Sequence, residues 1–236
     1  MTLALDHLVV AARTLDEGVA WCEQVLGITP GPGGVHGFMG THNRLFRVAS
    51  LQYPRAYFEI IAIDSNAPRP GRRRWFDLDD PALQSALRGG PQPIHWVARC
   101  DDIAARVAAL KQRGHDAGEV LHAERETPSG ILRWQIAVRQ DGARLHGGAW
   151  PTLIQWGEVH PADAMPDSGV SLAQFSVSGL PAELSQELPS TVLPDAASTT
   201  EVPGATRRPR IRATLLTPRG LVTLQSSGSE IQDVQR

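Results

Sequence analysis

Two stretches of this chain are close copies of one another, and each carries a histidine at the same place. They are residues 5–10 (LDHLVV), with His7, and residues 93–98 (PIHWVA), with His95. Each histidine is followed by an amphipathic helical pattern that stops at a glycine, Gly27 in one copy and Gly114 in the other. Because the pattern of a strand followed by a helix occurs twice, we predict a fold built from two repeated units.

Apolar periodicity predicts the remaining elements of both copies. In the first copy we expect a strand over 4–12, a helix over 14–27 and strands over 44–48 and 57–63. In the second copy we expect strands over 93–99, 132–139 and 152–156, with a helix over 101–113. Each copy then ends in an apolar strand with one polar residue set into it, Glu59 in the first and Gln155 in the second. The two histidines and these two polar residues are therefore predicted to hold equivalent places in the two copies.

The fold class expected from this pattern is α+β, with paired βαβββ modules over about 3–64 and 92–158 in a domain of residues 1–160. The insert between the modules is rich in Pro and Arg. The insert contains a run of three arginines at residues 72–74. This run predicts a solvated face or, as the minority interpretation, a site that binds an anionic substrate. Residues 161–236 resemble a reduced third copy without the histidine or the acid. We expect this piece to pack on the domain or to pair two chains in a homodimer.

Composition excludes several classes of function. A formal net charge of −2 gives no reason to expect nucleic acid or an anionic membrane as a partner. Two cysteines are too few for a disulfide framework. No signal peptide is recognised before the first strand, and no apolar run is long enough to span a bilayer. We therefore expect a cytoplasmic protein that acts on a small molecule.

The marked positions suggest a metal site in a cleft between the modules. His7, His95 and Glu59 together are the ligand set of an open site for Zn, Mn, Fe or Ni, with free positions for water or substrate oxygens. Such an ion stabilises negative charge on a chelated oxygen. The alternative is that both histidines are buried strand residues with ordinary hydrogen-bond partners. Further candidates for the pocket wall are His36, His42, Asn43, Trp134 and Gln155, whereas four other histidines show no usable spacing: His115, His122, His146 and His160.

The repeat with strand histidines and a strand Glu resembles the vicinal oxygen chelate superfamily, which includes glyoxalase I, extradiol dioxygenases and fosfomycin-resistance proteins. The nearest resemblance is to its glyoxalase-like group, through the loop over residues 36–43 (HGFMGTHN). It covers about residues 3–157. It implies paired modules of the glyoxalase, bleomycin-resistance and dihydroxybiphenyl dioxygenase type, with His7, Glu59 and His95 as metal ligands.

One position departs from the superfamily pattern. Gln155 falls where the superfamily usually has a second Glu, which in glyoxalase I is also the base, and an amide cannot accept a proton at neutral pH. Standard glyoxalase I and extradiol dioxygenase activities are therefore not expected. The resemblance leaves Glu59 as the candidate catalytic residue of a metal-dependent lyase, isomerase or related enzyme. The alternative is a metal-free protein that binds or sequesters a small molecule on the same scaffold.

Overall fold

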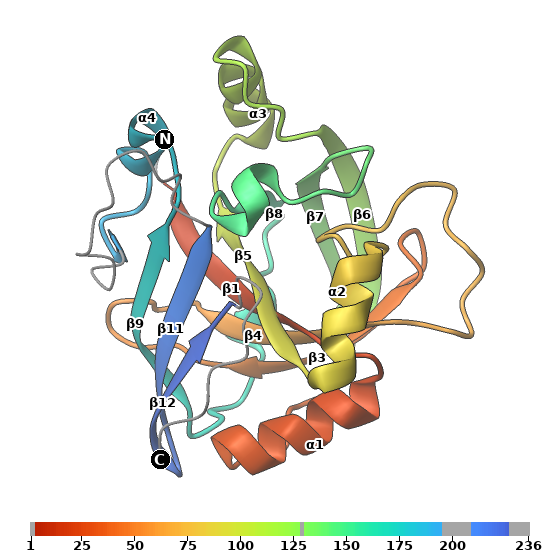
Figure 1. Ribbon diagram of the computed structural model, residues 1–236, viewed down its shortest axis with the longest axis vertical. Helices are drawn as coiled ribbons and strands as arrows, with labels where there is room; N and C mark the ends of the chain where they lie inside the picture. The colour runs from red at the N-terminus through yellow and green to blue at the C-terminus, as the bar shows by residue number, and fades with distance from the viewer. Residues whose placement is uncertain (1–2, 128–129, 195–208, 227–236) are drawn as a thin grey trace.

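The computed structural model describes residues 3–127, 130–194 and 209–226 (Figure 1). The helices are α1 (Leu15–Leu26), α2 (Pro81–Ala86), α3 (Ile103–Gln112) and α4 (Ala182–Ser185). The strands of the first module are β1 (Ala4–Ala11), β2 (Val35–His36), β3 (Thr41–Arg47) and β4 (Tyr57–Ile63). Those of the second are β5 (Gln92–Arg99), β6 (Glu119–Thr127), β7 (Gly130–Val138) and β8 (Thr152–Trp156). The remaining strands are β9 (Ser171–Ser178), β10 (Val192–Pro194), β11 (Arg210–Thr217) and β12 (Gly220–Gln225).

The two modules form one eight-stranded sheet in the order β2-β3-β4-β1-β5-β8-β7-β6. Each module runs strand, helix and three strands, which confirms the predicted βαβββ pattern. The first strands of the modules, β1 and β5, pair antiparallel at the centre, whereas each pairs parallel with the last strand of its own module. The sheet therefore places the two histidine strands side by side.

Local sequence signals set the ends of the first helix as predicted. The side chain of Thr14 accepts the backbone N–H of Glu17, and Gly27 ends the helix with a left-handed φ of 75°. That φ is strained for any residue with a Cβ. The Glu17 carboxylate pairs with Arg13.

The eight-stranded sheet has two differently covered faces. Its outer face, which carries Leu8, Phe58 and Trp96, packs in one apolar cluster with α1, α3 and α4 and with the smaller sheet. Its inner face, which carries Val9 and Val97, belongs to a second cluster. That cluster also includes apolar residues of the insert and of the loop before β3: Met39, Trp75, Phe76, Leu78 and Leu87. The insert thus fills part of the inner face.

The C-terminal residues form a second sheet in the order β10-β9-β11-β12. Phe175 of β9 packs on Trp96 of β5 with ring centroids 5.1 Å apart, and Leu172 N–H donates to Val48 O over 2.8 Å. Figure 1 shows these blue strands beside β1 and β5. This piece covers the outer face, and its pairing of two chains stays a prediction.

The arginine run of the insert ties the insert to the fold. Arg72 Nη2 donates to the carbonyls of Val138 and Arg139, and Arg74 pairs with Asp79 at 2.7 Å. The side chains of Arg72 and Arg74 are only 19% and 14% exposed. Neither predicted role, a solvated face or a grip on an anion, describes these two arginines.

Candidate functional site

His7 and Glu59 face each other on the neighbouring strands β1 and β4. His7 pairs with Tyr57 and Val9 pairs with Glu59, so alternation along the strands points both side chains to the inner face. His7 Nε2 lies 3.5 Å from Glu59 Oε2, and each residue is 5% exposed. The His7 ring also stacks on Tyr57 with centroids 4.5 Å apart. The structure therefore brings two of the predicted ligands together in a nearly closed site.

Asp6 lies behind His7 and was missed by the sequence reasoning. Its Oδ1 is 2.7 Å from His7 Nδ1, while its Oδ2 accepts from Trp156 Nε1 at 3.0 Å and lies 2.9 Å from His160 Nε2. The register of β1 and β5 shifts between Leu5 and His7, an irregularity of the kind that re-aims a side chain. The available signal was a carboxylate inside an apolar strand, which is costly unless paired.

Asn43 and His36 continue the network on the other side of Glu59. Asn43 Nδ2 donates to Glu59 Oε1 at 2.7 Å, and its Oδ1 accepts the Gly34 N–H at 2.8 Å. His36 Nε2 lies 3.4 Å from Asn43 Nδ2, and His36 Nδ1 lies 3.1 Å from Thr41 Oγ1. Most of the buried polar residues in the described parts of the chain belong to this one network: Asp6, His7, His36, Thr41, Asn43, Glu59 and His160. A buried network in which the members satisfy one another holds its side chains in fixed places.

The charges of the network support one another. Burial lowers the pKa of His7, but the contacts with Asp6 and Glu59 outweigh burial and raise it to about 9. Burial favours the neutral form of Asp6, yet hydrogen bonds from His160 and His7 hold the pKa of Asp6 well below its ordinary value. For Glu59, His7 and Asn43 likewise outweigh burial and lower the pKa. At neutral pH an imidazolium therefore stands between two carboxylates.

His95 lies on the same face but does not join the pair. Thr152 N–H donates to His95 Nε2 at 3.2 Å, the Thr152 hydroxyl is 3.0 Å from the same nitrogen, and the ring packs on Phe76 of the insert. Burial and the charge of Arg144 hold the pKa of His95 well below its ordinary value. His95 is thus a neutral ring whose Nε2 is held by Thr152 of β8, while its buried Nδ1 has no hydrogen-bond partner among the described residues.

Gln155 points to the face of the sheet opposite His7 and Glu59, and it lines a separate pocket along strands β6 to β8. Its Oε1 accepts the N–H of Ile103 at 2.9 Å, at the start of α3. The strand register explains this position: Val9 pairs with Glu59 in the first module, and Val97 pairs with Thr152 in the second. Thr152, and not Gln155, is therefore the structural counterpart of Glu59.

The other predicted wall residues divide between the two faces. Trp134 packs on Trp156 with centroids 5.7 Å apart and belongs to the inner cluster. His42 alternates with Thr41 and Asn43 along β3, so it points away from Glu59. Trp156 and His160 join the site through Asp6, although the spacing of His160 gave no signal.

The predicted three-ligand metal set does not form. In the described residues no group of three or more His, Cys, Asp or Glu side chains is arranged to hold a metal ion. His95 Nε2 accepts the N–H of Thr152, and among the described residues no hydrogen bond or ion pair joins His95 to His7 or Glu59. In the described residues the three predicted ligands therefore do not surround one point.

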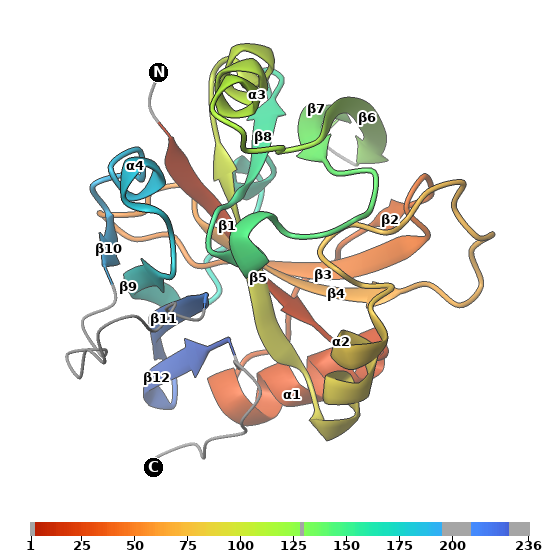
Figure 2. The same cartoon turned by 45° about the horizontal axis from the view of Figure 1, so that its top comes forward.

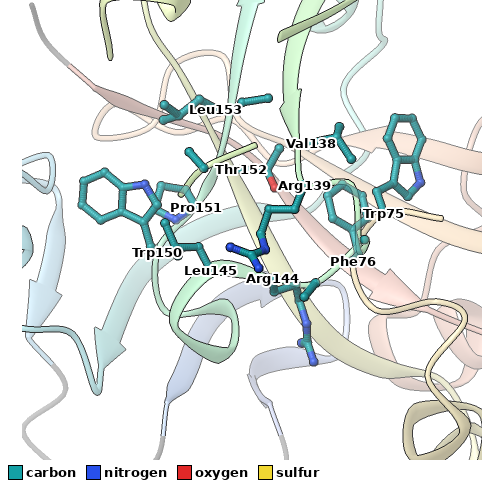
Figure 3. A pocket seen from close by; sticks show the side chains of 14 residues that line it. Trp75, Phe76, Val138, Arg139, Arg144, Leu145, Trp150, Pro151, Thr152 and Leu153 are labelled. Atoms are coloured by element: carbon teal, nitrogen blue, oxygen red, sulfur yellow. The ribbon is translucent and has the colours of Figure 1, made fainter. Parts of the chain in front are cut away.

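A small cavity lined by Phe76 and Thr152, the two residues that contact His95, is too small to hold a substrate. Its volume is about 20 Å³, which is room for about one water molecule. Figure 3 shows Trp75 and Phe76 of the insert on one side of it, with Trp150 and Pro151 opposite.

Comparison with known proteins decides the family. The model of the glyoxalase-like domain family matches residues 5–192, most of the chain. The chain belongs to this family. The resemblance to the glyoxalase-like group of the vicinal oxygen chelate superfamily is thereby confirmed. No curated protein matches this glyoxalase-like domain.

Solved structures resemble this chain at low sequence identity. A hypothetical protein from Staphylococcus aureus is 18% identical with a TM-score of 0.52, and the match covers 78% of this chain and 73% of that chain. A variant of methylmalonyl-CoA epimerase from Streptomyces coelicolor, in complex with 2-nitronate-propionyl-CoA, is 19% identical with a TM-score of 0.42 and coverages of 67% and 99%. The first of these likenesses shows a similar fold and nothing about the substrate. No helix in the described ranges is long and apolar enough to cross a bilayer.

Proposed function

We propose that this glyoxalase-like domain is a small-molecule enzyme that moves a proton next to a carbonyl group, with His7 and Glu59 as its acid–base pair. The observation that carries the proposal is the buried approach of His7 Nε2 to Glu59 Oε2 at 3.5 Å. The second heteroatom of each group is already held, by Asp6 and by Asn43 respectively. The two facing atoms are thus the ones left for a substrate.

The geometry gives each group a distinct role. Glu59 Oε2 takes the proton from the carbon next to the carbonyl, since its lowered pKa keeps it ionised at neutral pH. His7 Nε2–H donates to the carbonyl oxygen and stabilises the negative charge that develops there. Asp6 holds the His7 ring in place and keeps it charged. Asn43 positions the Glu59 carboxylate.

A metal-assisted form of the reaction is the competing proposal. The buried Asp6 carboxylate behind His7 Nδ1 favours it, because metal-bound histidines are commonly oriented in this way. His7 and Glu59 would be the ligands from this chain, and His7 would have to lose its proton. Elemental analysis for Zn, Mn, Fe and Ni tests this form. About one ion per chain, lost in His7→Ala and Glu59→Ala, would establish the metal-assisted form and overturn the metal-free assignment.

The proposed activity is tested by hydrogen exchange in D2O. Wild-type protein is incubated with hydroxyacetone, lactaldehyde and pyruvate, and proton NMR follows the signal of the hydrogen next to each carbonyl. We expect loss of that signal with at least one compound, and a rate roughly a hundredfold lower in Glu59→Gln. Glu158→Gln, an exposed acid just after β8, is the matched control and should exchange at the wild-type rate.

Binding without exchange gives the contrasting outcome. If a compound shifts the thermal unfolding of the protein yet keeps its hydrogen in D2O, the alternative of a metal-free binding or sequestering protein replaces the enzyme assignment.

A further inference from the structure

Arg125 lies on the inner face of β6, the edge strand of the second module. Leu121 and Ala123 of the same strand pack against the inner cluster, and strand alternation puts Arg125 on their side. Its cross-strand partner Leu132 is a member of that cluster. Arg125 is half-buried, in contrast to the exposed Glu124 and Glu126 that flank it. Its side chain is therefore directed to the face that carries the His7–Glu59 pair.

The Arg125 guanidinium reaches the opposite end of the sheet. A Cβ placed on Gly34, just before the other edge strand β2, would lie 1.8 Å from Arg125 Nη1. Figure 2 shows β2 and the β6–β7 hairpin on the same side of the molecule. The N–H of Gly34 donates to Asn43, which in turn holds Glu59. Arg125 thus lies against Gly34, which two hydrogen bonds connect through Asn43 to the candidate base Glu59.

The charge of Arg125 also reaches the site. Burial lowers the pKa of His36 to about 4; the Glu59 carboxylate opposes this shift and the Arg125 guanidinium adds to it. Burial raises the pKa of Tyr57, on which His7 stacks, and the positive charge of Arg125 acts in the opposite direction.

No acid balances this arginine within the part of the chain that the structure describes. Several other half-buried arginines of the domain are paired with acids, as Arg74 is with Asp79 and Arg144 is with Asp77. For Arg125 neither an ion pair nor a hydrogen bond is found among the described residues. A half-buried guanidinium that faces a polar site without a counter-ion is suited to a carboxylate, which it binds with two parallel hydrogen bonds.

We propose that Arg125 binds the carboxylate of a small 2-oxo or 2-hydroxy acid whose carbonyl end lies at His7 and Glu59. This inference rests on the proposed function for the position of the carbonyl end, but it concerns binding and not turnover. The arginine comes from the second module and the acid–base pair from the first, so the substrate is held between the modules.

The test measures the binding of pyruvate and of its neutral amide, pyruvamide, by isothermal titration calorimetry. We expect wild-type protein to bind pyruvate more tightly than pyruvamide, and Arg125→Gln to bind pyruvate about tenfold more weakly, as for the loss of one charge-assisted contact. Arg133→Gln is the matched control, because Arg133 lies on the outer face of the same hairpin and pairs there with Glu124. This control should bind both compounds as the wild type does.

A second variant leaves the arginine in the chain and moves it. Gly34→Ala places a methyl group where the guanidinium lies, and Gly34 has no left-handed φ that would make alanine strained. We expect this variant to unfold like the wild type and to bind pyruvate more weakly. Equal pyruvate affinity in wild type and Arg125→Gln, or no preference of the wild type for pyruvate over pyruvamide, would overturn the proposal. Pyruvate binding that depends on Arg125 without hydrogen exchange would overturn only the proposed acid–base activity.

Discussion

His160 Nε2 lies 2.9 Å from Oδ2 of Asp6, so a residue that follows the second module is joined to the first strand of the first module. Both side chains are almost completely buried, at 2% and 0% exposure. Trp156, at the end of β8, donates to the same carboxylate oxygen. One buried acid thus fixes the ends of the two modules relative to each other and holds the His7 ring.

Asp6→Asn should destabilise the protein by about 3 kcal/mol, because it removes one partner of a buried, charged network. An amide cannot accept from His7, His160 and Trp156 as the carboxylate does. Urea unfolding gives the free energy, and proton NMR titration should show a lower pKa for His7. Asp163→Asn is the control, since Asp163 is an exposed acid paired with Arg55. A His7 pKa unchanged by Asp6→Asn would contradict the positioning role.

Stability should fall as the pH rises through the pKa of His7. The folded-state pKa is raised from 6.5 to about 9, so the stabilisation is complete below pH 6.5 and is lost between pH 6.5 and about 9. The difference corresponds to on the order of 3 kcal/mol. Urea unfolding at several pH values measures it. His7→Gln should flatten this part of the profile, and an equally steep fall in that variant would assign the effect to another group.

Gln155→Ala should affect helix α3 and leave the site intact. The loss of the bond from Ile103 N–H to Gln155 Oε1 should cost about 1 kcal/mol, as for other helix-end hydrogen bonds. Gln135→Ala, its cross-strand neighbour on the outer face, is the matched control and should change stability less. Hydrogen exchange of small carbonyl compounds should be unaltered in both. A loss of exchange in Gln155→Ala alone would place this residue back in the site.

His95→Phe should destabilise the protein by about 2 kcal/mol without changing its metal content. The new ring still packs on Phe76, but Thr152 N–H loses its acceptor. Thr152→Val keeps that N–H bond and removes only the hydroxyl, so its cost should be smaller. Elemental analysis and urea unfolding check both variants. A divalent ion that is present in the wild type and absent in His95→Phe would restore His95 as a ligand.

The sequence by itself determined the repeated modules, the strand and helix order, and the shared face of His7 and Glu59. These follow from local patterns: periodicity of two along strands, periodicity of 3.6 along helices, and caps such as Thr14 and Gly27. Glu59 was found because a carboxylate in an apolar strand needs a partner. The same argument applied to Asp6 would have found it as well.

Only the tertiary structure decided which residues complete the site. The pairing of β5 with β8 puts Thr152 opposite Val97 and so turns Gln155 to the outer face, since neighbouring strand positions point to opposite faces. The packing of Phe76 against His95 depends on the path of the insert, which has no periodic signal. The meeting of Asp6 with His160 depends on where distant segments pack, and spacing along the chain carries no information about that.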